Sequence, residues 1–172
     1  MEIFKETTSK GTGTKIALLE HPLHPMTVTF PIAFVISLLP SDIAYLYLGD
    51  PFWARVSLWL AGAGAFSAMI AGVVGTGELL SVSAIRRRAA AWNHFVAAVV
   101  MISVVWANWV MRLPDHEAAI YPWGIALSAL GALLVALAGW LGGDLVFEHL
   151  VGTGEETEEE EEADAEAAEQ RA

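Results

Sequence analysis

The sequence predicts an all-α integral membrane protein in which four transmembrane helices form an antiparallel, up-down bundle. Of its 172 residues, 55% are hydrophobic and the mean hydropathy is positive, which is too apolar for a soluble domain of this length. Four apolar runs are each long enough to cross about 30 Å of hydrocarbon as a helix. A tight turn at residues 48–51 (LGDP) joins the first two runs, so these two helices are expected to form an antiparallel hairpin.

We place the four spans at residues 26–48, 52–74, 92–111 and 121–143. The first span contains an acid, Asp42, near its far end. Because a charge in hydrocarbon is costly, Asp42 is interpreted either as a functional or pairing residue, or as an interfacial residue beside Tyr45 and Tyr47. Small residues recur at every fourth position in the second and fourth spans, which lets membrane helices approach closely. Residues 75–78 (GTGE) are expected to end the second helix.

The segments on either side of the bundle have a different composition. Residues 1–19 form a polar arm without the apolar stretch of a signal peptide. Residues 20–153 hold the four-helix domain, and residues 154–172 form a tail. Residues 155–172 contain ten acids and one arginine, which is −9 of the total charge of −11 and leaves −2 for the rest. A segment of this composition cannot bury apolar area, so the tail is predicted to be disordered.

The distribution of basic residues predicts the orientation in the membrane. An even number of spans puts both termini on one side, together with the loop between the second and third spans. Seven basic residues belong to that side and two to the opposite side. The seven are Lys5, Lys10, Lys15, Arg86, Arg87, Arg88 and Arg171, and the two are Arg55 and Arg112. The positive-inside rule therefore places both termini in the cytoplasm.

Two of the five histidines stand immediately before the first span, in residues 20–25 (EHPLHP). Each of them precedes a proline, which disfavours the helical conformation at the preceding residue. In an extended segment with three residues per turn, His21 and His24 would project from the same side. Pro25 fits the first turn of the helix that follows. This segment marks the point where the polar arm becomes a membrane span.

The predicted topology brings four histidines to one side of the membrane. His94 opens the third span and His149 follows the fourth, so both belong to the side of His21 and His24. We take His94 as the first candidate ligand, because it lies within a rigid helix, and His24 or His149 as its partner. Acids near a ligand histidine orient its ring. The candidate acids are Glu78, Asp144, Glu148 and Asp42.

Several roles for this cluster stay open on residue types alone. Imidazole binds haem iron, zinc and non-haem iron, but it also transfers protons, contacts lipid headgroups or bridges helices. The chain has no cysteine, which excludes disulfides and iron–sulfur ligation within it. It also has no glycine-rich phosphate loop, serine nucleophile elbow or HExxH helix, so an enzyme acting alone is not predicted. The bilayer is the predicted partner, nucleic acid is not, and no oligomeric state is predicted.

Two stretches of the chain together resemble a known family. Residues 21–25 (HPLHP) lead into residues 29–33 (TFPIA), and residues 139–146 (GWLGGDLV) lead to His149. Over residues 20–153 the chain is similar to the bacterial and archaeal multi-pass membrane proteins of domain of unknown function 2231. Asp42 matches the acid that this family carries in its first span. The resemblance implies a protein of the prokaryotic inner membrane.

The resemblance also bears on function. The family is grouped near small haem-binding membrane cytochromes, and some relatives are joined to Rieske-type iron–sulfur domains. This implies redox work beside a membrane, with a redox partner protein. The expectation is therefore a small redox-associated subunit that binds haem b or a transition metal through its cytoplasmic-side histidines. The alternative is a structural or accessory bundle without a cofactor, whose histidines bridge helices.

Overall fold

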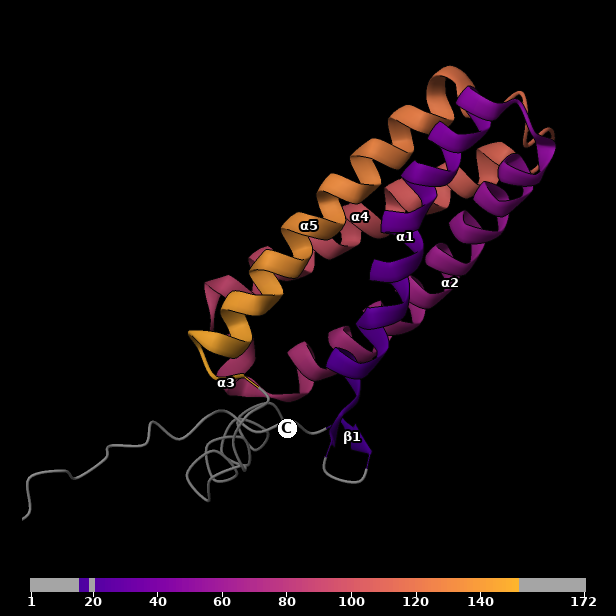
Figure 1. The fold of residues 1–172 in the computed structure, drawn as a ribbon. Helices are drawn as coiled ribbons and strands as arrows, with labels where there is room; N and C mark the ends of the chain where they lie inside the picture. Colours follow the sequence, from indigo (N-terminus) through magenta and orange to yellow (C-terminus); the bar gives the residue numbers. More distant parts are fainter. Residues whose placement is uncertain (1–15, 19–20, 152–172) are drawn as a thin grey trace, which may run out of the picture.

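Four long helices extend along the molecule in a computed structural model that describes residues 16–18 and 21–151 (Figure 1). They are α1 (Leu23–Leu48), α2 (Pro51–Ser81), α4 (Ala89–Arg112) and α5 (Ile125–Phe147). The short helix α3 (Ser83–Arg86) joins α2 to α4, and a π-helical turn (Ile120–Gly124) precedes α5. A pair of two-residue strands, β1 (Ala17–Leu18) and β2 (His21–Pro22), precedes α1.

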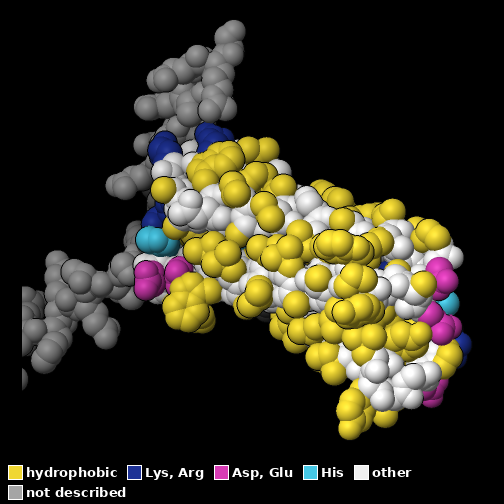
Figure 2. Space-filling model, turned by 90° about the horizontal axis from the view of Figure 1, so that it is seen from above, with side chains coloured by type: hydrophobic (Ala, Val, Ile, Leu, Met, Phe, Trp, Pro, Cys, Tyr) yellow, Lys and Arg dark blue, Asp and Glu magenta, His cyan; other side chains and the backbone are white. Residues whose placement is uncertain are grey.

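The predicted all-α membrane class with four spanning helices is confirmed, because all four long helices are apolar enough and long enough to cross a membrane. Large hydrophobic side chains cover the outside of the bundle along its length, and charged side chains gather at its two ends (Figure 2). This is the surface that a bilayer requires, since hydrocarbon solvates apolar side chains and excludes charges. The protein is therefore a membrane protein.

The first two helices form a hairpin. Asp50 caps α2 by accepting a hydrogen bond from the backbone N–H of Phe52, and Pro51 occupies the first helical position, where its missing N–H costs nothing. Near this turn, the Ser41 hydroxyl in α1 donates to the backbone carbonyl of Trp53 in α2. At the opposite end of the molecule, the start of α1 contacts the second half of α2. The two helices therefore run in opposite directions.

The packing order of the bundle determines which helices face each other. The helix α1 packs on α2 and α5, and α4 packs on the same two neighbours. Consequently α1 and α4 lie diagonally across the bundle. The centre is filled by a small cluster of apolar side chains. The cluster consists of Val35, Ala65, Ala68, Met101, Val105 and Val135.

The start of α1 differs from the expectation. His24 was expected in an extended segment before the first span, but it lies in the first turn of α1, which begins at Leu23. Pro25 disfavours the helical conformation at His24, but it costs no hydrogen bond at this position. The N–H groups of a first helical turn have no partner within the helix, so the missing N–H of Pro25 leaves nothing unpaired. The His24 ring also gains a hydrogen bond to α2. Tertiary contact thus overrides the local preference.

The end of α2 also differs from the expectation, because the helix continues through Gly75 and Gly77 to Ser81. The hydroxyl of Thr76 donates to the carbonyl of Gly72 one turn earlier, so this hydroxyl has its hydrogen bond without an interruption of the helix. Both glycines lie against side chains from other segments, which supports a helix that the local sequence would interrupt. The predicted acidic tail and most of the predicted polar arm lie outside the described residues.

Candidate functional site

Two histidines from diagonally opposed helices meet inside the bundle. His24 extends from the first turn of α1, and His94 from the second turn of α4. Their ring centroids are 6.1 Å apart and their ring planes are inclined by 78°. Both side chains are half-buried. We call His24 and His94 the histidine pair.

Each ring of the pair is held by a backbone carbonyl of the neighbouring helix. Nδ1 of His24 lies 3.0 Å from the carbonyl oxygen of Ala71, and Nδ1 of His94 lies 3.0 Å from that of Ala138. A carbonyl oxygen only accepts, so both Nδ1 atoms must carry the proton and donate it. The lone pair of each neutral ring is therefore on Nε2. Within the described part of the chain, neither Nε2 atom makes a hydrogen bond.

Glycines make room for both rings. A Cβ atom added at Gly75 would lie 2.6 Å from Cε1 of His24, and one at Gly142 would lie 3.1 Å from Cε1 of His94. Any larger residue at Gly75 would displace the ring, because real Cβ atoms do not approach that closely. Gly139, one turn before Gly142, has nothing within 4 Å of its added Cβ atom. Of these three glycines, the two that face the imidazoles are the ones with a close approach.

The donor set of the pair can be compared with what different ligands need. No group of three or more histidine, cysteine, aspartate or glutamate residues that could hold a metal ion occurs among the described residues. A bare zinc ion is held by three or four protein ligands, whereas haem iron receives four nitrogens from the porphyrin and needs only axial ligands. Two imidazoles whose Nε2 lone pairs are not used by a hydrogen bond in the described residues would be the donor set that haem iron takes from a protein.

The other predicted histidines lie apart from the pair. His149 follows the end of α5, and its backbone N–H donates to the carbonyl of Asp144. His21 is part of β2, where only its backbone is described. Glu148 is the C-cap residue of α5 and is exposed. In the described residues, none of the predicted acids orients an imidazole of the pair, because backbone carbonyls occupy both Nδ1 atoms.

Glu78 is the predicted acid with the most unusual surroundings. It lies near the end of α2, and only 8% of its surface is exposed. Its Oε1 atom is buried and has no hydrogen-bond partner in the described structure. Burial of a carboxylate without a partner is costly, so this position calls for a functional explanation.

Asp42 was expected among the acids of the histidine layer, but it lies at the other end of the bundle. Its two carboxylate oxygens accept hydrogen bonds of 2.8 and 2.7 Å from the two terminal nitrogens of Arg112. Both side chains are 0% exposed. Arg112 was placed in the loop after the third span, whereas it is the last residue of α4 and points into the bundle. Asp42 therefore has a pairing role.

Two polar residues complete this buried network. Nε of Arg112 donates to the side-chain carbonyl of Asn108 at 2.9 Å, and the amide of Asn108 donates to the hydroxyl of Ser128 at 3.0 Å. The Ser128 hydroxyl lies 2.6 Å from Asp42 Oδ2 and donates to it. The network ties α1, α4 and α5 together, and sequence reasoning missed Asn108, Arg112 and Ser128. The available signal was one acid near the far end of the first span and one base immediately after the third span, at the same end of the predicted bundle.

Comparison with known proteins gives the family of the chain. No curated protein and no solved structure matches it. The family model described as "Predicted membrane protein (DUF2231)" matches residues 20–155, which contain all four helices, the histidine pair and the buried network. This confirms the resemblance carried by residues 21–33 and 139–149. The chain therefore belongs to the DUF2231 family of predicted membrane proteins.

Proposed function

We propose that this protein is a small haem-binding, redox-associated membrane subunit, in which Nε2 of His24 and Nε2 of His94 hold one haem b. The observation that carries the proposal is a pair of imidazoles that meet across the bundle with both Nδ1 protons engaged and both Nε2 atoms without a hydrogen bond in the described residues. Haem, when bound, supplies one-electron transfer. The proposed partner is a redox protein in the same membrane.

The chain's own residues have defined tasks under this proposal. The carbonyls of Ala71 and Ala138 set the tautomer of each ring and make its Nε2 atom more electron-rich. Gly75 and Gly142 let the rings lie against the backbones of α2 and α5. Both rings are half-buried between helices, and the degree of burial influences the reduction potential of a bound haem. Among haem and transition metals we favour haem, because the described residues provide two imidazoles and no third ligand.

The alternative is a structural bundle without a cofactor. The specific observation in its favour is that each imidazole bridges two helices, His24 from α1 to α2 and His94 from α4 to α5. Such bridges account for the Nδ1 atoms of both rings. They do not account for the meeting of the two rings at 6.1 Å across the diagonal of the bundle. A single measurement separates the two proposals.

Purified protein from cells that produce haem is expected to show a b-type signal in a reduced-minus-oxidised absorbance spectrum, and His94→Ala is expected to abolish it. The reason is that His94 would provide one of only two protein ligands. His149→Ala is the matched control at the same end of the bundle and should keep the signal. Colourless protein without bound metal would refute the haem proposal and favour the structural bundle.

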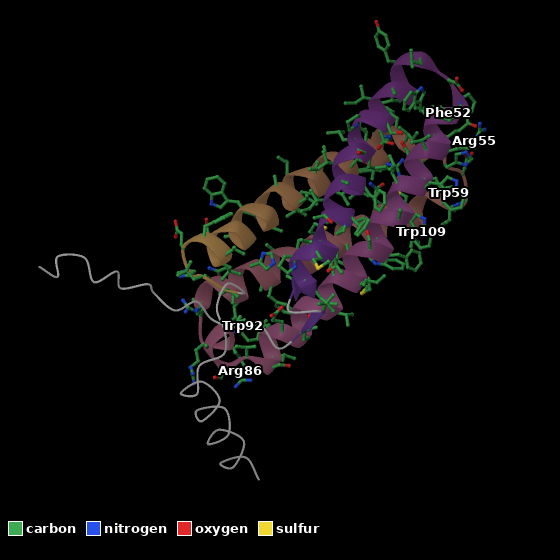
Figure 3. All side chains as sticks on the ribbon, turned by 60° about the horizontal axis from the view of Figure 1, so that its bottom comes forward. Phe52, Arg55, Trp59, Arg86, Trp92 and Trp109 are labelled. Carbon is green, nitrogen blue, oxygen red and sulfur yellow. The ribbon has the colours of Figure 1, made fainter. Side chains whose placement is uncertain are left out.

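We also propose that both termini face the cytoplasm of a prokaryotic inner membrane. Arg86 and Arg55 lie at opposite ends of the bundle (Figure 3). The start of α1 and the end of α5 lie at the end with Arg86, and Arg87 and Arg88 follow Arg86 in the chain. Among the described lysine and arginine residues, Arg55 is the unburied base at the opposite end, because Arg112 is enclosed with Asp42. The asymmetry of positive charge supports this orientation.

The orientation is tested by a reporter joined to the C-terminus. A phosphatase that is active only in the periplasm is expected to remain inactive, whereas a fluorescent protein that matures in the cytoplasm should fluoresce. The same two reporters inserted in the loop at residues 114–117 should give the opposite results. Periplasmic activity at the C-terminus would contradict the proposed orientation and would move the histidine pair to the outer side of the membrane.

A further inference from the structure

Glu78 lies on the helix face of α2 that holds His24, one member of the histidine pair. Ala71, Gly75 and Glu78 are four and three residues apart, so they follow one face of α2. The first two of these residues contact the His24 ring, Ala71 through its carbonyl and Gly75 by its close approach. Glu78 is one turn further along this face, about 4.5 Å beyond Gly75 at 1.5 Å per residue. It makes no hydrogen bond with either imidazole, so it is not part of the proposed ligand set.

The surroundings of Glu78 are largely apolar. The adjoining cluster consists of Leu79, Val82, Ile85, Ala91 and Leu145, from α2, α4, α5 and the α3 segment. Among the described side chains, the titratable and charged groups at this end of the bundle are His24 on α1, Arg86, Arg87 and Arg88 on and after α3, His94 on α4, and Asp144, Glu148 and His149 at the end of α5. None of them forms an ion pair or hydrogen bond with Glu78 in the described structure.

The three arginines that follow Glu78 in the sequence do not pair with it. Arg86 donates to the carbonyl of Leu80, and Arg87 donates to the hydroxyl of Ser83. Nε of Arg88 is buried without a partner, as is Oε1 of Glu78, yet the two side chains do not pair. Among the described residues, the carboxyl group of Glu78 therefore has no neutralising cation in its apolar site. In such a site, a proton is the remaining means of neutralising its charge.

We propose that Glu78 is the proton acceptor of the histidine-pair site, so that reduction of the site is coupled to uptake of one proton. The inference rests on the proposed haem function. A one-electron donor reduces ferric iron to ferrous iron, and one proton from the aqueous phase adds to the carboxylate of Glu78 to form the carboxylic acid. The added electron and proton cancel, so the net charge of the site does not change. Opposite charges that enter a medium of low dielectric together cost far less than one charge alone.

The test is a redox titration of the purified, haem-loaded protein with dithionite and mediators at a series of pH values. The midpoint potential should decrease with rising pH across the neutral range, approaching the limit of one proton per electron. A tenfold change in proton activity then corresponds to about 59 mV for a one-electron couple. Glu78→Gln should remove most of this dependence. Glu148→Gln, an acid at the same end of the bundle but exposed, is the matched control and should retain it.

A second measurement uses the wild-type protein, so it does not depend on whether a variant folds. Reduction of the wild-type protein should produce a carboxylic acid C=O band in the infrared difference spectrum, and the band should shift in heavy water. Haem-loaded protein whose potential is independent of pH, and which lacks this band, would overturn the role of Glu78 while leaving the histidine pair in place. Protein that binds no haem would overturn the proposed function itself, so the two failures are distinguishable.

Discussion

Replacement of Asp42 by asparagine is expected to destabilise the protein by about 3–5 kcal/mol, the cost of removing one partner of a buried ion pair. The substitution nearly preserves the shape of the side chain but leaves the Arg112 guanidinium charged and enclosed. Asp42 and Arg112 are both 0% exposed and joined by two hydrogen bonds. Neither water nor lipid headgroups can replace the lost charge at this position.

The loss should affect three helices together. Ser128 of α5 donates to Asp42, and Asn108 accepts from Arg112, so the carboxylate is the common acceptor of a network that includes α1, α4 and α5. Truncation of one member leaves the others with unsatisfied groups in a medium of low dielectric. The expected result is a lower free energy of unfolding and a lower yield of folded protein from the membrane.

The measurement is thermal or denaturant unfolding in detergent, with Asp50→Asn as the matched control. Asp50 is exposed and caps α2, and asparagine caps helices about as well, so this change should cost only a few tenths of a kcal/mol. The double variant Asp42→Asn with Arg112→Met removes both charges and should recover part of the loss. A cost of about 1 kcal/mol or less for Asp42→Asn, as for an exposed ion pair, would contradict a structural role for this network.

Gly75→Ala should have the second largest effect, although it removes no ligand. Its added methyl group would lie 2.6 Å from Cε1 and 2.8 Å from Nδ1 of His24, so the ring must move and its bond to the Ala71 carbonyl must weaken. Overpacking of this kind costs about 1–3 kcal/mol. If the strain falls on the ring position, haem affinity should decrease by a factor of about 5 to 150, since about 1.4 kcal/mol is tenfold.

The loss of haem affinity on replacement of a glycine by alanine should be larger where the structure leaves less room for the added methyl group. Gly142→Ala places its methyl group 3.1 Å from the His94 ring and should have a smaller effect, whereas Gly139→Ala meets nothing within 4 Å and should have none. Haem content per protein, measured from the absorbance spectrum during titration with haem, gives the order of the three variants. Equal affinities for all three would show that the ring positions do not determine binding.

The helices themselves could be predicted from the sequence because they depend on a local property. An apolar run of spanning length must form a helix in hydrocarbon, where each backbone group needs a partner within the segment. The class and the approximate spans follow from this requirement. The exact ends do not. The helix α1 begins at Leu23, where His24 contacts α2, and α2 continues to Ser81, past glycines that lie against other parts of the chain.

The approximate depth of each polar residue in the membrane could also be predicted from the sequence. The sequence shows which histidines belong to the side of the termini, because the number of spans determines on which side each loop lies. It does not show which of them meet. A helix turns by about 100° per residue, so a small change in its rotation decides whether a side chain faces lipid or the interior.

The tertiary structure decided the pairings. The diagonal placement of α1 and α4 brings His24 to His94 rather than to His149, and the carbonyls of Ala71 and Ala138, which no sequence pattern marks, hold the rings. The same rotation directs Arg112 inward to Asp42 instead of into the adjoining loop. The sequence by itself thus determined a four-helix membrane protein with histidines at one end, because hydrophobic length acts locally. The site and the buried ion pair depend on helix rotation, which only the packing of all four helices determines.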